Sequence, residues 1–185
     1  MRKNYGAQPI MYPQPALVVA SYDENGIPNA LACGGGISDM TQISLILYKV
    51  HKTVQNILAR GAFTVSMVVA DYVVECDYLG VVSGNKVSNK LEKSGLHTTK
   101  SEFVDAPFID ELPVALECKL VSYDEESGRM VGEIVNASAD ESVLDEEEKI
   151  LMEKLHPVAI ESMHNTYWVI GEKIGDAYKD GLKLK

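Results

Sequence analysis

The sequence ALVVASYDENGIPNALAC, residues 16–33, predicts a β-hairpin at the start of the fold. Apart from Leu17, residues 16–22 are small, β-branched or aromatic, which is typical of a buried strand. The following Asp-Glu-Asn-Gly, residues 23–26, is a turn sequence. We therefore expect residues 27–33 to return antiparallel to the first strand.

Two more strands are expected at residues 43–48 and 63–69, where apolar and β-branched residues predominate. Residues 54–60 between them have the spacing of a short helix. Thr53 is expected as the N-cap of this helix and Gly61 as its C-cap. Because the connections are this short, antiparallel pairing of the strands is favoured.

A second hairpin is predicted from residues 114–123 and 130–137, which flank a Ser-Gly turn. Apolar residues at the even positions from 114 to 120 alternate with Glu117 and Lys119. This alternation predicts one buried face and one exposed face, with Glu117 on the exposed side.

Three short helices are also expected. One begins at Asp71 and runs to residue 79, and another covers residues 88–93 and ends at Gly95. The acidic residues 145–148 are interpreted as the solvated first turn of a helix that Pro157 ends, because carboxylates favour a helix N-terminus.

The last strand is expected at residues 166–170, with Trp168 in the core. Strands then outnumber helices, so the predicted fold is mainly β with short helices, an antiparallel β-barrel. A length of 185 residues, 46% of them hydrophobic, suits one domain over residues 1–185 with a sizeable core.

Charge and hydropathy exclude several classes of protein. The net charge of −10 and the pI near 4.8 argue against nucleic-acid binding, which needs a basic surface. Apolar runs are too short for a membrane span, and the N-terminus lacks a signal peptide's apolar region. A cytoplasmic protein is expected.

No motif identifies a catalytic side chain or a metal site. The nucleotide-binding glycine motifs, the G-x-S-x-G motif and the H-E-x-x-H motif do not occur, and the four histidines are scattered. The cysteines Cys33, Cys76 and Cys118 are too far apart in sequence to suggest a zinc cluster, and free thiols are expected. Such a chain can still catalyse reactions if a cofactor supplies the reactivity.

Residues 48–57 gather Lys49, His51 and Lys52 just before the helix expected at residues 54–60. The free N–H groups and the dipole at a helix N-terminus favour a bound anion, and the three basic side chains could add charge-assisted contacts. The segment alone leaves two readings open: a phosphate site, or an ordinary N-cap beside a solvated basic loop.

A series of motifs along nearly the whole chain resembles the flavin reductase-like, FMN-binding split-barrel family, and within it the flavoredoxin branch. In chain order the motifs are PALV (15–18), GIPNA (26–30), HKTVQNI (51–57), GAFTVS (61–66), CDYLG (76–80), VSGNKVSNKLEKSGL (82–96), APFIDE (106–111) and YWVIG (167–171).

The resemblance implies a six-stranded antiparallel split barrel that forms a homodimer, with FMN near the subunit interface. By motif position, three elements would bind FMN. They are a strand whose backbone contacts the flavin ring, a loop that binds the phosphate, and a lysine near the flavin. These positions are Asn29, Ala30, Leu31, Ala32, Cys33, Gly34, Tyr48, Lys49, His51, Lys52, Thr53 and Lys90.

Three positions depart from what relatives often have. Ala32 replaces Thr, Gly34 replaces Ser, and His51 replaces an arginine that would pair more strongly with phosphate. Tyr48 could contact the flavin or belong to the core, and Lys90 could lie near the flavin or be a solvated helix residue.

The function that the resemblance implies is that of an FMN-binding oxidoreductase. It would pass electrons from NADH or NADPH through FMN to an unknown acceptor. One alternative is an FMN-binding electron carrier or redox-sensing module with no nicotinamide turnover of its own. A third reading is a barrel that has lost its flavin.

Overall fold

The computed structural model describes residues 1–185, with the side chain of Ile37 left out of the description. Its main sheet has nine strands, and each neighbouring pair is antiparallel. They are β1 (Gln14–Tyr22), β2 (Pro28–Gly34), β3 (Ile37–Ser38), β4 (Gln42–Ile46), β5 (Ala62–Met67), β8 (Val114–Tyr123), β9 (Arg129–Ala139), β10 (Val158–Glu161) and β11 (Thr166–Val169). The small strands β6 (Thr98–Lys100) and β7 (Pro107–Ile109) form a separate pair.

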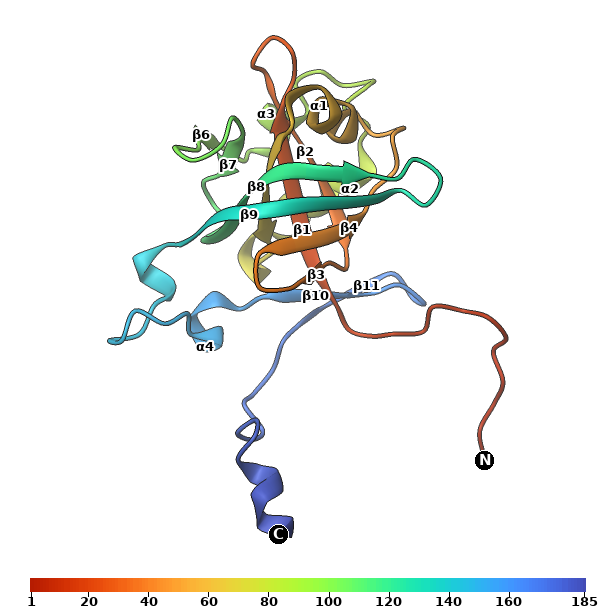
Figure 1. Cartoon of the computed structure of the whole chain (residues 1–185), viewed down its shortest axis with the longest axis vertical. Helices are drawn as coiled ribbons and strands as arrows, with labels where there is room; N and C mark the ends of the chain where they lie inside the picture. Colours follow the sequence, from red (N-terminus) through yellow and green to blue (C-terminus); the bar gives the residue numbers. More distant parts are fainter.

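Seven of the nine strands make the barrel, in the order β2-β1-β5-β8-β9-β4-β3 (Figure 1). Strands β2 and β3 are the two ends of this run, so the barrel is open between them. The hairpin predicted from residues 16–33 is confirmed, and its register pairs Ala16 with Gly34 and Tyr22 with Pro28. The predicted class, a mainly β antiparallel split barrel with short helices, is confirmed. The predicted six strands become seven because the two-residue β3 pairs with β4 after the glycine triplet.

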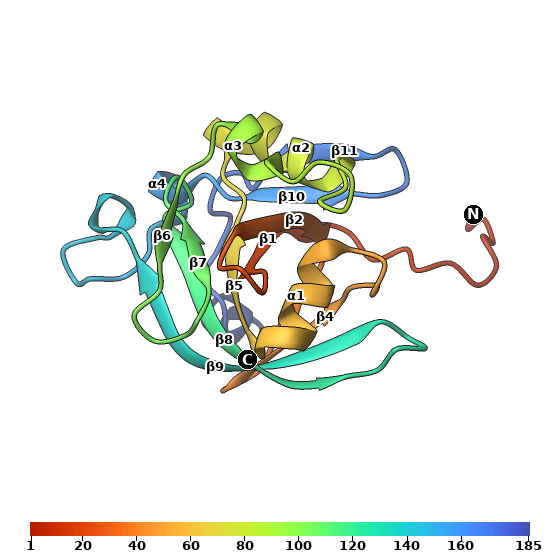
Figure 2. The ribbon, with the colours of Figure 1, turned by 90° about the horizontal axis from the view of Figure 1, so that it is seen from above.

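The helices cover the barrel at one end and on one side. Helix α1 (Lys52–Arg60) packs against β1, β2 and β8, and Figure 2 shows it within the curve of the sheet. Helices α2 (Val73–Val81) and α3 (Lys90–Ser94) pack on the outside of β2. Helix α4 (Met152–Leu155) and the 3-10 turns Ala70–Tyr72, Glu141–Val143 and Asp180–Leu184 complete the elements.

Strand β1 is buried on both faces, because it separates two hydrophobic cores. Leu17 and Val19 point into the barrel, where they meet Phe63. Ala16, Val18 and Ala20 face the other way, toward α2 and α3. Burial on both sides explains the continuous run of small and aliphatic residues at 16–20 in this strand.

Helix α1 begins earlier than expected, and the prediction of Thr53 as its N-cap is wrong. His51 is the N-cap, and Thr53 lies inside the first turn, where it is buried. The hydroxyl of Thr53 accepts a hydrogen bond from Asn29 and so is occupied by a tertiary contact. Gly61 is the C-cap as predicted, with a φ of 73° that suits glycine.

The expected exposure of Glu117 is also wrong, because the residue is only 1% exposed. A β-bulge between Glu117 and Cys118 interrupts the alternation, so both residues are buried. Two hydrogen bonds satisfy the carboxylate: the hydroxyl of Ser101 donates one, and Nδ2 of Asn136 donates the other at 2.5 Å.

The acidic residues 145–148 do not open a helix. Oδ1 of Asp145 accepts hydrogen bonds from the N–H groups of Glu147 and Lys149, at 2.8 and 2.9 Å, and so folds the segment into a turn. Leu144 and Ile150 pair across the base of this turn. The carboxylate therefore caps a loop, and helix α4 is confined to Met152–Leu155.

Asp71 does not cap a continuous helix either. A 3-10 turn covers Ala70–Tyr72, and α2 begins only at Val73 with no side-chain cap. The short helix expected near residues 88–93 is present as α3 and ends at Gly95 as predicted.

Trp168 is not a core residue, because 63% of it is exposed. It lies on β11, the edge strand that pairs only with β10 among the described strands, so no layer covers its outer side. Within residues 1–185, no helix combines the length and the apolar character that a membrane span requires. The assignment of the whole chain to one domain stays a prediction.

Candidate functional site

A cavity of about 410 Å³ lies where β2, the loop after β4, the start of α1 and the end of α2 meet. This volume falls within the range of small-molecule sites in proteins. The residues that line it are Asn29, Leu31, Ala32, Cys33, Ile46, Leu47, Tyr48, Val50, His51, Lys52, Thr53, Leu79, Gly80, Val81, Val82, Ser83, Gly84, Lys86 and Lys90. We call it the α1 cavity.

Nine of the residues predicted from the sequence lie together in the lining of the α1 cavity: Asn29, Leu31, Ala32, Cys33, Tyr48, His51, Lys52, Thr53 and Lys90. They are far apart in sequence, and the barrel brings them together because β2 runs past the start of α1.

Three predicted residues lie outside this lining. Ala30 is fully buried in the core between β1 and α2, on the opposite face of β2 from Leu31. Gly34 faces Ile160 of β10, where a Cβ would lie 2.7 Å from that side chain. Nζ of Lys49 pairs with Glu125 at 3.0 Å, which directs its charge toward the β8–β9 turn.

The structure adds a wall that residue-level prediction had missed: the segment from Leu79 to Gly84, together with Lys86. The C-terminus of α2 and the loop after it supply this wall. Within the motif at residues 82–96, nothing in the residue pattern singles out Gly84 or Lys86, because no side-chain pattern shows which side of a loop faces a cavity.

The N-terminus of α1 opens toward the cavity and provides an anion-binding end. His51 is the N-cap, and its side chain makes no capping hydrogen bond. The N–H groups of the first turn, beginning at Lys52, have no partners within the helix, and the helix dipole adds partial positive charge there. The side chains of Lys52 and Lys86 also line the cavity. This end therefore suits a phosphate or another anion.

Buried polar contacts fix the start of α1 against β2. Nδ2 of Asn29 donates a 2.6 Å hydrogen bond to Oγ1 of Thr53, and Oγ of Ser21 donates to the carbonyl of Thr53 at 3.3 Å. On the other side, Nδ2 of Asn85 donates to the carbonyl of Val50 at 2.8 Å. Strands β1 and β2 therefore hold the first turn of α1, and the segment after α2 holds the loop that precedes it.

Gly84 allows the loop after α2 to approach this contact closely. A Cβ at Gly84 would overlap Oδ1 of Asn29 and would lie 3.1 Å from Cβ of Lys52. Glycine is needed here because of close approach, and its φ is not in the left-handed region.

Lys90 is a buried lysine at the far side of the cavity. The residue is 3% exposed, and Nζ donates a 2.7 Å hydrogen bond to the carbonyl of Leu79 near the end of α2. Burial lowers the pKa of Lys90 from 10.5 to about 8. The interpretation of Lys90 as a solvated surface residue is therefore wrong.

Cys33 contributes a neutral wall. Burial raises the pKa of the Cys33 thiol to about 12, so the thiolate is rare at neutral pH. Burial likewise raises the pKa of the Cys76 and Cys118 thiols to about 12, and all three cysteines are free, as expected.

The chemistry of the lining fits a ligand with an anionic group and an apolar body. Basic side chains and free N–H groups gather at the α1 end, and Leu31, Leu79 and Val82 supply apolar surface. Tyr48 lines the cavity and is 54% exposed, so it lies at the mouth and not in the core.

Comparison with known protein families gives a match to the flavin reductase like domain over residues 11–157. An uncharacterized protein of Aquifex aeolicus (strain VF5) is 34% identical over 108 residues, which are 57% of this chain and 55% of that protein. The chain therefore spans about half the length of this relative.

Solved structures of two flavoredoxins are similar over the whole chain. The flavoredoxin of Desulfovibrio vulgaris (Miyazaki F) is 33% identical, with a TM-score of 0.92 over 98% of this chain and 100% of that one. The flavoredoxin from Methanosarcina acetivorans is 26% identical, with a TM-score of 0.86 over 100% of both chains. An FMN-binding domain of a flavin reductases-like enzyme from Shewanella baltica OS155 shares the fold at 20% identity, with a TM-score of 0.78 over 88% of both chains.

Proposed function

The chain belongs to the flavin reductase-like domain family, and from this membership we propose that it is a flavoprotein that binds FMN in the α1 cavity. The predicted similarity to the flavoredoxin branch is confirmed by the two flavoredoxin structures. One observation carries the proposal of FMN: an N-terminus of α1 with no side-chain cap opens on a cavity that also has apolar walls.

In this proposal the phosphate of FMN binds the first-turn N–H groups of α1 and the ammonium of Lys52. His51 and Lys86 also line the cavity, and the ammonium of Lys86 would add a second positive charge for the phosphate. Asn29 and Thr53 act by positioning, because their hydrogen bond holds the helix start against β2.

The apolar part of the flavin would lie along Leu31, Ala32 and Cys33 of β2, with Leu79 and Val82 opposite. The substitutions at Ala32 and Gly34 leave these positions without hydroxyl groups, so the backbone of β2 would supply the polar contacts to the ring. Lys90 would place a titratable positive charge at this side of the cavity.

Bound FMN would supply the redox chemistry, since flavins exchange electrons in one-electron and two-electron steps. We propose that NADH or NADPH is the electron donor and that the acceptor is a second, unknown molecule. The protein's own part is to bind, orient and shield. The exposed side chains of Ile46, Val50 and Val81 form an apolar rim at the cavity where a donor could stack.

The test mixes the FMN-loaded protein with NADH or with NADPH under anaerobic conditions. Reduction of the flavin is measured as the loss of its visible absorbance. Fast loss of absorbance with either nucleotide, followed by repeated turnover when oxygen returns, supports the oxidoreductase. Bound FMN that neither nucleotide reduces would contradict it and favour the electron carrier. The homodimer and the cytoplasmic location expected from the resemblance stay predictions.

A further inference from the structure

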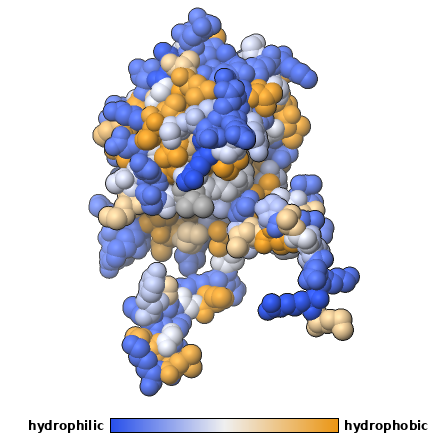
Figure 3. All heavy atoms as spheres, turned by 45° about the vertical axis from the view of Figure 1, so that its right-hand side comes forward, coloured by the Kyte–Doolittle hydropathy of each residue, from blue (hydrophilic) through white to orange (hydrophobic). Residues whose placement is uncertain are grey.

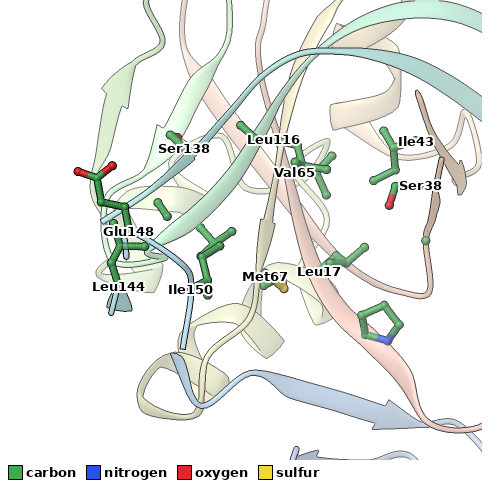
Figure 4. A pocket seen from close by; sticks show the side chains of 15 residues that line it. Leu17, Ser38, Ile43, Val65, Met67, Leu116, Ser138, Leu144, Glu148 and Ile150 are labelled. Carbon is green, nitrogen blue, oxygen red and sulfur yellow. The ribbon is translucent and has the colours of Figure 1, made fainter. Parts of the chain in front are cut away.

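A second and larger cavity, of about 670 Å³, lies at the end of the barrel opposite α1 (Figure 4). Its apolar lining comes from the ends of β1, β4, β5 and β8, and it includes Leu17, Ile43, Met67 and Leu116. We call it the barrel-end cavity. It has no part in the proposed FMN site.

The rim of the barrel-end cavity is acidic on one side. The turn at residues 145–148, Asp-Glu-Glu-Glu, stands beside it, and Glu148 contributes to the lining. The hydrogen bonds of Asp145 hold this turn in place, and Leu144 and Ile150 at its base extend the apolar lining.

The C-terminal arm, residues 171–185, extends away from the body of its own chain (Figure 1). It carries Ile174, Tyr178 and Leu184, which are 101%, 99% and 94% exposed. Figure 3 shows the arm as a separate extension with hydrophobic residues at its surface. Large apolar side chains with this exposure lose the free energy that burial would give, so they indicate a surface that a partner covers.

The arm is ordered by contacts within itself. Oδ2 of Asp180 accepts a 2.9 Å hydrogen bond from the N–H of Asp176, and Nζ of Lys183 donates to Asp180 Oδ1 at 2.8 Å. Lys173 pairs with Asp176 at 2.7 Å. The hydrogen bonds found for residues 171–185 all join members of this segment.

The start of the arm is fixed, and its length is sufficient to reach another molecule. The N–H of Ile170 donates to the carbonyl of Pro157, which anchors the chain at β10. From there, fifteen residues would span at most roughly 50 Å if fully extended, and the 3-10 turn Asp180–Leu184 shortens this reach. The arm's own chain leaves its apolar side chains uncovered, so a second molecule is the better candidate to cover them.

The charge of the C-terminal arm is compatible with binding at the acidic rim of the barrel-end cavity. The arm has four lysines against three acidic side chains, so its net side-chain charge is +1, whereas the other 170 residues carry −11. A neutral or basic segment can approach the acidic rim of the barrel-end cavity without repulsion.

We propose that the barrel-end cavity binds the C-terminal arm of a second copy of this chain, and that two copies exchange arms reciprocally. Each copy then offers the same cavity and the same arm, which is the arrangement of a two-fold symmetric dimer. The apolar side chains of the arm fill the cavity, and the lysines lie against the acidic turn. This proposal does not depend on flavin binding.

The first test measures the dimer dissociation constant of the full-length chain by sedimentation. Replacing Ile174→Asp and Leu184→Asp together is expected to raise this constant at least tenfold. Phe103→Asp is the matched control, because Phe103 is 57% exposed and lies outside the barrel-end cavity. A monomeric wild-type chain, or a constant that the arm variant leaves unchanged, would overturn the proposal.

The second test keeps the apolar residues of the arm and locates its binding site. The Lys179→Cys variant is prepared in ¹⁵N-enriched form, and its new thiol is coupled to a benzophenone maleimide. This protein is mixed at low concentration with excess wild-type chain of natural isotope content. The mixture is then concentrated and irradiated. The native thiols should react little at neutral pH, since burial raises the pKa of each to about 12.

Cross-links from the labelled arm to unlabelled peptides containing residues 137–150 are expected. Cross-links found only within the labelled chain would mean that the arm folds onto its own body, and cross-links to other surfaces would mean a different interface. Either result contradicts the proposal.

Discussion

Nδ2 of Asn29 and Oγ1 of Thr53 are joined by a buried 2.6 Å hydrogen bond between β2 and the first turn of α1. Asn29 is 8% exposed and Thr53 is 1% exposed. Both residues line the α1 cavity, so one contact links the strand proposed for the flavin ring with the helix end proposed for the phosphate. Four predictions test parts of this arrangement.

The hydrogen bond should be visible as a coupling energy. Asn29→Ala and Thr53→Ala should each lower the free energy of unfolding by about 1–3 kcal/mol, because each leaves a buried polar group without its partner. The double variant should lose less than the sum of the two, with a coupling of at least about 0.5 kcal/mol in urea unfolding. Thr99→Ala, at an exposed site, is the control. Strictly additive losses would show that the two side chains act independently.

The phosphate site should distinguish two neighbouring lysines. Lys52→Ala should weaken FMN binding roughly tenfold or more, because a charge-assisted hydrogen bond contributes about 1.5–3 kcal/mol. Lys49→Ala should have little effect, since Lys49 pairs with Glu125 outside the cavity. Equilibrium titration of both variants with FMN, and with riboflavin, which lacks the phosphate, measures the change in affinity for each flavin. Equal losses for the two ligands in Lys52→Ala would contradict the phosphate assignment.

Gly84 should not tolerate a side chain. Gly84→Ala places a methyl group against Oδ1 of Asn29 and close to Lys52, so the loop must move and FMN affinity should fall by roughly tenfold. Gly171→Ala is the control, because no heavy atom of the described residues, apart from its two chain neighbours, lies within 4 Å of the added methyl group. Fluorescence titration of both variants gives the comparison. Wild-type affinity in Gly84→Ala would show that the loop adapts without cost.

The buried ammonium of Lys90 should make stability rise with pH. Its pKa is lowered to about 8 in the folded chain, so between pH 8 and 10.5 the unfolded state binds more protons and the free energy of unfolding increases. Relative to Lys90→Met, the flavin-free wild type should therefore gain about 2 kcal/mol between pH 7 and pH 10. Urea unfolding of both proteins at the two pH values tests this. A difference that does not change with pH would mean that Lys90 titrates normally.

The sequence predicted the strands best where the pattern is local. The β1–β2 hairpin follows from the run at residues 16–22 and the turn after it, and these features lie within 18 consecutive residues. The class of fold followed from the number of such runs and from the family motifs. These signals do not depend on distant contacts.

The sequence-based predictions were wrong where contacts between distant parts of the chain determine whether a residue is buried or exposed. A β-bulge buries Glu117, and Ser101 and Asn136, from other parts of the chain, provide the hydrogen bonds that its buried carboxylate needs. Trp168 is exposed because β11 is an edge strand, which depends on the strand order of the whole sheet. No local pattern contains either fact.

The candidate site was predicted in outline but not in detail. Motif position indicated residues of β2 and of the loop before α1, and the structure places nine of the twelve named residues in one cavity. Lys49 was indistinguishable from Lys52 in sequence, and only the position of Glu125 separates them. Gly84 became significant only through its distance from Asn29 and Lys52.

The central claim is that the α1 cavity binds FMN through its phosphate. The most direct test is a fluorescence titration of the purified full-length chain with FMN and, in parallel, with riboflavin at neutral pH. We predict saturable FMN binding at one flavin per chain, with riboflavin bound at least roughly tenfold more weakly. Equal affinity for the two flavins, or no saturable binding of FMN, would contradict the claim.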